Sequence, residues 1–227
     1  MKKTVILAIA AATMLTTSIG FAAPLTDYSA GKTSIDLIWR NSDAELKTSD
    51  GTDSLAKKSN LDFGITTGLG NNFAIQYNDY NAKSKDTSLP DGYGGTYQEH
   101  GSLKTQELNV LYKIDKNISA YTGVVRVKGN VNSDGNGFSS NTKNKMQFGL
   151  VGSTKIADKT TAYAVVGVAS DYTNWKIGVS QEIAPNLEFT VDYRRLQAKK
   201  LTFDVAGTPL NADVTVKGLG FGVGYKF

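Results

Sequence analysis

The side chains able to perform acid–base or nucleophilic chemistry are few in this sequence. It contains no cysteine and one histidine, so thiol catalysis, disulfides and cysteine-bound metals are excluded. The histidine, His100, lies between Glu99 and Ser102, and hydrolases combine histidine with such partners. Adjacency in sequence does not make a catalytic triad, because a triad is assembled by the fold. The sequence therefore predicts that this protein is not an enzyme and has no catalytic residues and no cofactor.

One segment resembles the start of a calcium-binding loop. It places Asn130, Asn132 and Asp134 at alternate positions and follows them with Gly135. The twelfth position of such a loop must supply a bidentate glutamate, but here it is Asn141. The sequence therefore predicts no metal site.

A larger set of charged residues recurs at every second position of short apolar segments. Leu37 and Trp39, for example, alternate with Asp36 and Arg40. A β-strand directs successive side chains to opposite faces, so each segment has an apolar face and a polar face. If the polar faces line a lumen, their charges form either a narrow pore or a plug of buried ion pairs. The predicted lumen residues are Asp36, Arg40, Asp62, Glu107, Lys113, Arg126, Lys176, Glu182, Glu188, Asp192, Arg194, Gly218, Gly220, Gly222 and Gly224.

Ten segments of this kind can be read, and their connections mostly alternate between long and short. The short connection at Ser170 is an exception. The segment 161–168 alternates poorly, so eight strands remain an alternative. An even count places both chain ends on the same side. The predicted strands are 33–40, 60–67, 73–78, 107–114, 121–128, 146–151, 161–168, 175–182, 187–194 and 216–227.

The last segment carries a family resemblance. From Leu219 to Phe227 every second residue is apolar or aromatic, with glycines and Lys226 between them. This alternation, ending in Tyr225-Lys226-Phe227, resembles the closing strand of bacterial outer-membrane proteins. The four inward glycines leave either a path along the wall or room for arginine side chains.

The chain as a whole resembles small outer-membrane β-barrels, the porin-like and opacity-type group related to the transmembrane domain of outer membrane protein A. The resemblance implies an all-β, antiparallel transmembrane barrel in the bacterial outer membrane, with long loops outside and both termini periplasmic. It also implies that the barrel-assembly machinery recognises Phe227.

Aromatic residues near the strand ends predict two girdles at the membrane interfaces. If the apolar faces pointed inward, the chain would be a soluble calyx, but that fold leaves the aromatic bands unexplained. The short-turn girdle is predicted to contain Phe73, Tyr112, Tyr121, Tyr163, Phe189, Tyr225 and Phe227, and the long-loop girdle Trp39, Phe63, Tyr77, Trp175 and Tyr193.

The first 22 residues form a predicted signal peptide. Two lysines precede an apolar stretch, and small residues at Gly20 and Ala22 predict cleavage after Ala22, with Ala23 as the alternative. The barrel domain is therefore 23–227. Removing Lys2 and Lys3 lowers the net charge from +4 to +2, a mild excess that predicts no nucleic-acid partner. No later stretch has the roughly 18 apolar residues of a membrane helix.

Two functions follow from these observations. The first is a narrow outer-membrane pore for small solutes. The alternative is a closed structural barrel whose surface loops, such as Ser88–Tyr97 with its two tyrosines, bind an extracellular partner in adhesion. Loop lysines, among them Lys57 and Lys199, predict contact with outer-membrane lipids, including the phosphates of lipopolysaccharide.

Overall fold

The computed structural model describes residues 24–49, 51–91, 93–205 and 207–227, and the predicted signal peptide lies outside them. These ranges contain no helix long and apolar enough to cross a membrane. The strands are β1 (Thr33–Lys47), β2 (Thr52–Gly70), β3 (Phe73–Lys83), β4 (Thr87–Pro90), β5 (Thr96–Lys113), β6 (Ile118–Ser133), β7 (Asn136–Ser139), β8 (Lys143–Ala157), β9 (Thr160–Ala169), β10 (Tyr172–Ala184), β11 (Leu187–Val205) and β12 (Thr208–Lys226).

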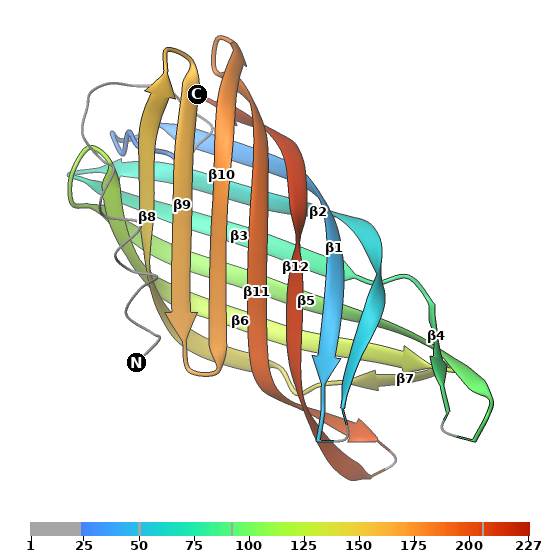
Figure 1. Ribbon diagram of the computed structural model, residues 1–227. Helices are drawn as coiled ribbons and strands as arrows, with labels where there is room; N and C mark the ends of the chain where they lie inside the picture. Colours follow the sequence, from blue (N-terminus) through green and yellow to red (C-terminus); the bar gives the residue numbers. More distant parts are fainter. Residues whose placement is uncertain (1–23, 50, 92, 206) are drawn as a thin grey trace, which may run out of the picture.

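The strands form one antiparallel sheet that closes on itself. Of its 12 strands, β4 and β7 are short additions beside β5 and β6. The other ten follow the order β5-β3-β2-β1-β12-β11-β10-β9-β8-β6, and pairing of β6 with β5 completes the ring. The predicted ten-stranded antiparallel barrel is therefore confirmed. Figure 1 shows β8–β12 in front, with β3, β5 and β6 crossing behind them.

The start of β1 and the C-terminal residue meet at the short-turn end of the barrel. β1 pairs with β12 from Ser34 to Lys47, and Thr33 and Phe227 exchange backbone hydrogen bonds of 2.8 and 2.9 Å. At the same end Asn71 and Asn72 turn β2 into β3 with φ angles of 52° and 67°. Such left-handed residues suit a tight hairpin because their twist matches that of the strands.

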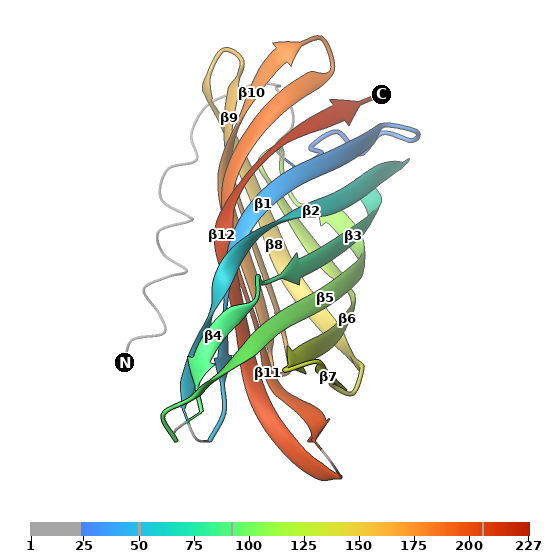
Figure 2. The same ribbon diagram turned by 90° about the vertical axis from the view of Figure 1, so that its right-hand side faces the viewer.

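The predicted long loops are mostly strand, which corrects the sequence-based expectation. The segments 41–59, 79–104, 129–144 and 195–213 were predicted to be long loops, but β1, β2, β3, β5, β6, β11 and β12 continue into them. The hairpins extend past the barrel at the end opposite the termini (Figures 1 and 2). In these extensions the apolar residues no longer alternate onto the outer face, and several of them, such as Leu201, Phe203 and Val214, point inward and are buried.

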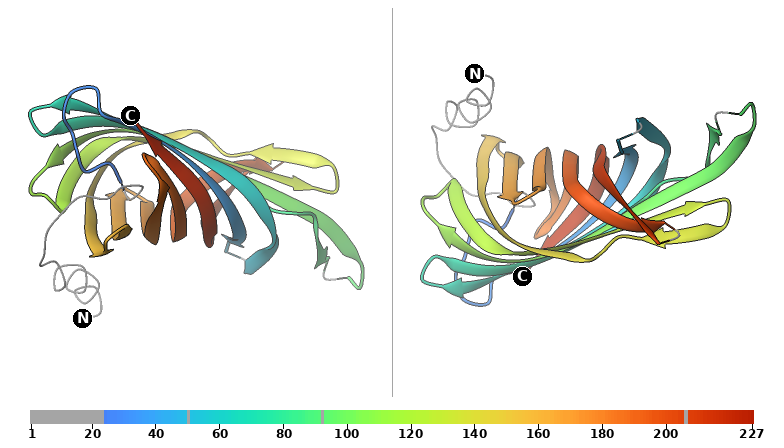
Figure 3. Two further views of the ribbon diagram at one scale, coloured as in Figure 1. Left: turned by 90° about the horizontal axis from the view of Figure 1, so that it is seen from above. Right: turned by 90° about the horizontal axis from the view of Figure 1, so that it is seen from below.

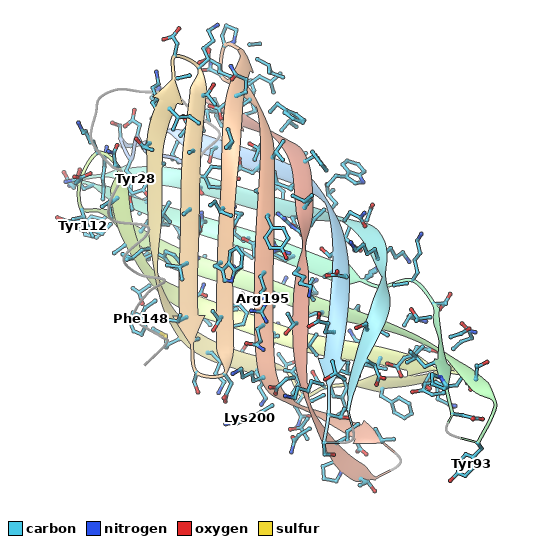
Figure 4. The ribbon with its side chains drawn as sticks, in the orientation of Figure 1. Tyr28, Tyr93, Tyr112, Phe148, Arg195 and Lys200 are labelled. Atoms are coloured by element: carbon cyan, nitrogen blue, oxygen red, sulfur yellow. The ribbon has the colours of Figure 1, made fainter. Side chains whose placement is uncertain are left out.

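Apolar side chains point outward along the barrel wall. Phe148 and Trp39 are 60% and 63% exposed, and Figure 4 shows Phe148 and Tyr112 directed away from the barrel. The apolar face is therefore the outer one, as predicted for a membrane barrel and unlike a soluble calyx. Tyr121 and Tyr163 were predicted for the girdle but are buried on the inner face.

Candidate functional site in the barrel lumen

The centre of the lumen holds a cluster of four buried charges from three different strands. The Arg40 guanidinium lies 2.7 Å from an Asp62 carboxylate oxygen and 2.5 Å from one of Asp192. Arg194 lies 3.1 Å from Asp62. All four side chains are buried, and such charges are tolerated only when they are paired. Their pairing ties β1 and β2 to β11, which is two strands away from β1 around the ring.

The glycines of β12 make room for this cluster. Gly220 lies opposite Arg40, and a Cβ on Gly220 would come within 2.9 Å of the guanidinium carbon. The Gly218 carbonyl accepts a 3.1 Å hydrogen bond from Arg40. Of the two roles predicted for the glycines, the structure shows the second: arginine occupies the space beside them.

A second polar group centres on Glu107 of β5. Its Oε1 accepts hydrogen bonds from the Tyr172 hydroxyl at 2.8 Å and the Asn174 amide at 3.1 Å, and its Oε2 accepts one from Asn78 at 3.2 Å. Nearby, the Arg194 guanidinium stacks on the ring of Tyr80 at 4.0 Å. Together with the charge cluster, these side chains form the polar layer of the lumen.

Further charges continue this layer toward the short turns. Lys226 lies 3.7 Å from Glu188, which also accepts a hydrogen bond from Ser180. Lys176 lies 5.5 Å from the ring centre of Tyr163, close enough for a cation–π contact. A cavity of ≈ 60 Å³ lies within the polar layer, with Asp36, Arg40, Glu107, Asn174, Lys176 and Arg194 among its lining residues.

An apolar layer closes the lumen on the side of the long hairpins. On β11 the inward residues change from Asp192 and Arg194 to Leu196 and Ala198. A pocket of only ≈ 20 Å³ is found beside this layer. We call it the loop-side layer, and its buried members are Ala82, Leu103, Val125, Val127, Tyr172, Leu196, Ala198, Leu201, Phe203, Ala212, Val214 and Val216.

A smaller apolar layer lies at the short turns and includes the segment before β1. Leu25 and Tyr28 of this segment are buried there, and the Tyr28 hydroxyl donates a 3.0 Å hydrogen bond to Ser119. Hydrogen bonds from the Ser29 amide and hydroxyl lower the pKa of the Asp27 carboxyl. We call this the turn-side layer, and its members are Leu25, Tyr28, Ala74, Leu111, Tyr121 and Val151.

The structure places most predicted lumen residues on the inner face, with one clear error. Arg126 is exposed on the outer wall, because Val125 and Val127 point inward on β6 and belong to the loop-side layer. Lys113 and Glu182 are half-buried at the strand ends, away from the charge cluster. The remaining twelve predicted residues alternate inward: Asp36, Arg40, Asp62, Glu107, Lys176, Glu188, Asp192, Arg194, Gly218, Gly220, Gly222 and Gly224.

Sequence reasoning missed the neutral partners of Glu107 and both apolar layers. Asn78 was recognised as an inward residue of its strand, and Gln76 and Asn109 likewise, but no pattern indicated their hydrogen bonds. Tyr172 and Asn174 precede the predicted eighth strand and were not assigned. Two signals for the turn-side layer were available: Leu111 follows Asn109, and Val151 follows Gly149, each an apolar residue on the polar face of its strand.

The long hairpins carry further titratable side chains, among them His100, Asp86 and Glu99. His100 Nδ1 lies 2.7 Å from an Asp86 oxygen, and both side chains are exposed. The described residues contain no group of three His, Asp or Glu side chains suited to a metal ion. Burial, reinforced by the carboxylate of Asp53, raises the pKa of Glu99. None of these contacts assembles a nucleophile with a base.

Comparison with known proteins finds similarity only among solved structures. No known protein family and no curated protein matches the chain. Ail, the attachment invasion locus protein of Yersinia pestis, is 15% identical with a TM-score of 0.41, covering 87% of this chain and 99% of Ail. Neisserial surface protein A is 16% identical with a TM-score of 0.41, covering 86% and 96%.

The outer membrane protein AlkL, solved in lipid bilayers, is 16% identical with a TM-score of 0.41 and covers 93% of this chain and 97% of its own. The neighbours are small outer-membrane β-barrel proteins. Identities and TM-scores this low carry no argument about function, which has to come from the barrel itself.

Proposed function

We propose that this chain is a bacterial outer-membrane β-barrel that forms a narrow pore for small solutes, closed in the state described here. The observation that carries the proposal is the polar cavity inside a ring whose outer wall is apolar. The cavity is lined by charges of both signs, and a soluble barrel of this size would place its apolar face inward.

The outer wall supports a membrane location. A transmembrane barrel presents an apolar band roughly 25 Å tall to lipid, with aromatic residues at its borders. Here Phe73 and Tyr112 pack together with ring centres 5.0 Å apart near the short turns, and Trp175 and Tyr193 pack 5.6 Å apart on the opposite side of the band. We place both termini in the periplasm, because short turns face that side in outer-membrane barrels.

The loop-side layer supplies the gate of the proposed pore. Hydrophobic constrictions close channels by excluding water from a narrow segment. The loop-side layer has this character, since it spans the lumen and carries no charge among its buried members. Because the turn-side layer covers the other end of the polar layer, solute would pass only when that layer opens and the wall residues of the loop-side layer separate.

Conductance of the folded protein in a planar lipid bilayer tests the proposal. We expect discrete current steps that become larger or more frequent in Leu201→Ala, which removes a fully buried member of the loop-side layer. Leu108→Ala is the matched control, because Leu108 is 53% exposed on the outer wall and should leave the current unchanged. A silent bilayer for both the parent and Leu201→Ala, with folding confirmed by a heat-dependent gel shift, would reject the pore.

A closed barrel with binding hairpins is the second candidate. It is favoured by the extended hairpins that carry β4 and β7 beyond the barrel, where Tyr93 is 97% exposed at a tip. Figure 4 shows Tyr93 far from the barrel wall. Binding of the parent to cells, lost when residues 84–95 are shortened, would support this function if the bilayer is silent.

The outer wall also carries a basic patch directly beyond the apolar band. Lys104 of β5 lies opposite Lys128 of β6, and Arg126 follows on the same face. We propose that this patch meets phosphate groups of outer-leaflet lipids, including lipopolysaccharide, because charged groups at that level lie among the headgroups. Asp79 accompanies Lys104 at 3.7 Å, so the patch keeps an excess of positive charge.

Two further parts of the proposal concern assembly and catalysis. Phe227 is exposed on the outer wall, which is compatible with recognition by the barrel-assembly machinery.

We also propose that the protein has no enzymatic activity. Peptide or lipid hydrolysis that is present in the parent and lost in His100→Ala would contradict this.

A further inference from the structure

Glu107 differs from the other buried carboxylates of the polar layer. Asp62 and Asp192 pair with arginine, and Glu188 pairs with Lys226. Within the described residues Glu107 has no such ion pair. We infer that Glu107 is the binding site for a small monovalent cation and makes the proposed pore selective for cations. The selectivity rests on the proposed pore, whereas the binding site does not.

The hydrogen bonds of Glu107 orient its carboxylate without neutralising it. All three donors are neutral, two of them amides and one a tyrosine hydroxyl. An ionised carboxylate has about four lone-pair directions, so these three contacts leave capacity for a positive ligand. A buried charge held only by neutral donors is costly, and a bound cation would remove that cost.

Oxygen atoms without partners lie close to Glu107. Asn174, which donates to Glu107 and lines the same cavity, has a buried Oδ1 that accepts no hydrogen bond in the described part of the chain. Thr105 lies two residues before Glu107 on the same face of β5. Its buried hydroxyl also has no hydrogen-bond partner among the described residues. Buried polar atoms are normally satisfied, so the Asn174 oxygen in particular is available to a positive ligand held beside Glu107.

The chemistry of these ligands selects the class of cation. They are one carboxylate and neutral oxygens, which suit a hard cation. Calcium sites collect more negative charge and six to eight oxygens, and the cavity of ≈ 60 Å³ is small. The ligand is therefore an alkali-metal ion of the potassium class rather than a divalent or bulky organic cation.

The charges around the cavity also leave Glu107 uncompensated. Arg40 and Arg194 balance Asp62 and Asp192. Asp36 has no ion pair in the described residues, but the positive charges of Lys176 and Lys226 both act on it. Glu107 is the remaining charge of this set. Its partner Tyr172 belongs to the loop-side layer, so the site lies where the polar path meets the gate, and a cation would be held directly before passage.

The test is the reversal potential in a planar bilayer under a potassium chloride gradient, for the parent and Glu107→Gln. We expect the parent to prefer potassium over chloride. Glu107→Gln should lower the permeability ratio about fivefold, the effect of one unit charge about 4 Å from an ion at the dielectric constant of water. Asp79→Asn is the matched control, since it removes one carboxylate from the outer wall of the neighbouring strand β3 and should change nothing. An anion-selective parent, or an unchanged ratio in Glu107→Gln, overturns the inference.

A second measurement needs no current and separates this inference from the pore. Ligands that bind only the folded state raise its stability, by an amount that grows with the logarithm of their concentration above the dissociation constant. Potassium chloride should therefore stabilise the detergent-solubilised parent more than choline chloride at equal ionic strength, and Glu107→Gln should lose the difference. Asn174→Ala, which removes the partnerless oxygen but no charge, should reduce it. A silent bilayer with an intact potassium effect rejects only the pore, and equal stability of the parent in the two salts rejects the binding site.

Discussion

The two apolar layers that bracket the polar lumen are built differently. Every buried member of the loop-side layer comes from the strands of the ring, including Leu201 and Phe203 of β11. The turn-side layer instead takes Leu25 and Tyr28 from the segment that precedes β1. One end of the lumen is therefore closed by the wall itself and the other partly by a strap that is not a wall strand.

This difference determines how each end can open. Opening the loop-side layer requires strands to move apart, because its side chains are fixed to hydrogen-bonded ladders. The strap is bound by fewer contacts: Gly70 donates a backbone hydrogen bond to Tyr28 and Gly31 donates one to Gly68. Segments with few contacts open locally at a lower free energy than the folded whole. The strap should therefore yield before the wall does.

The largest predicted effect concerns the polar layer, which lies between the two apolar layers. Asp62→Ala leaves Arg40 short of one partner and Arg194 without its ion pair, and unpairing buried charges costs about 4 kcal/mol. Urea unfolding in lipid vesicles should show this loss of stability. The control Asp79→Asn removes the charge of a half-buried carboxylate that contacts Lys104 on the outer wall and keeps an amide oxygen able to accept from Gln106, so it should cost less than about 1 kcal/mol. Equal effects of the two variants would mean that the polar layer does not hold the barrel together.

A smaller effect should distinguish the two apolar layers directly. Leu201 and Leu111 are both 1% exposed, in the loop-side and turn-side layers respectively. Leu201→Ala should cost about 3 kcal/mol, because the wall around it cannot collapse into the cavity. Leu111→Ala should cost about 1 kcal/mol less, since the strap can shift to fill part of the space. The same unfolding assay compares them, and a larger loss for Leu111→Ala would contradict the assignment of the strap as the softer part.

The sequence predicted the strands of the barrel better than the side chains that fill its lumen, and β6 shows why. Val124, Val125 and Val127 put apolar residues on both faces of that strand, so alternation could not identify the face toward lipid. Arg126 was assigned to the lumen because it is charged and alternates with Val125 and Val127, but it lies where the wall leaves the apolar band. Charge indicates an inner position only within the band, because outside it both faces of a strand tolerate polar residues.

The strap was beyond sequence reasoning for a related physical reason. Residues 24–32 have no strand periodicity, and their burial depends on space left at the barrel mouth by small residues. A Cβ on Gly68 would come within 2.4 Å of the Ser29 carbonyl oxygen, so the fit depends on a glycine about 40 positions away. The partners of Glu107 were likewise unpredictable, since Tyr172 reaches it from β10 across the closed ring and Asn78 faces it only through the register of β3 with β5.

The smallest predicted effect concerns the hydrogen bond between the side chains of Tyr28 in the strap and Ser119 in the wall. Tyr28→Phe removes the hydroxyl that donates to Ser119 and should cost about 1 kcal/mol. Ser119→Ala should cost about the same, and the double variant little more than either alone, because both remove one interaction. Amide hydrogen exchange of residues 24–32 is the sensitive measurement, since local opening of the strap changes before global unfolding. Faster exchange confined to the strap would establish it as a separately opening element. Faster exchange spread evenly over β5 and β6 would mean that the strap and the wall open together, and the contrast between the two ends of the lumen would then disappear.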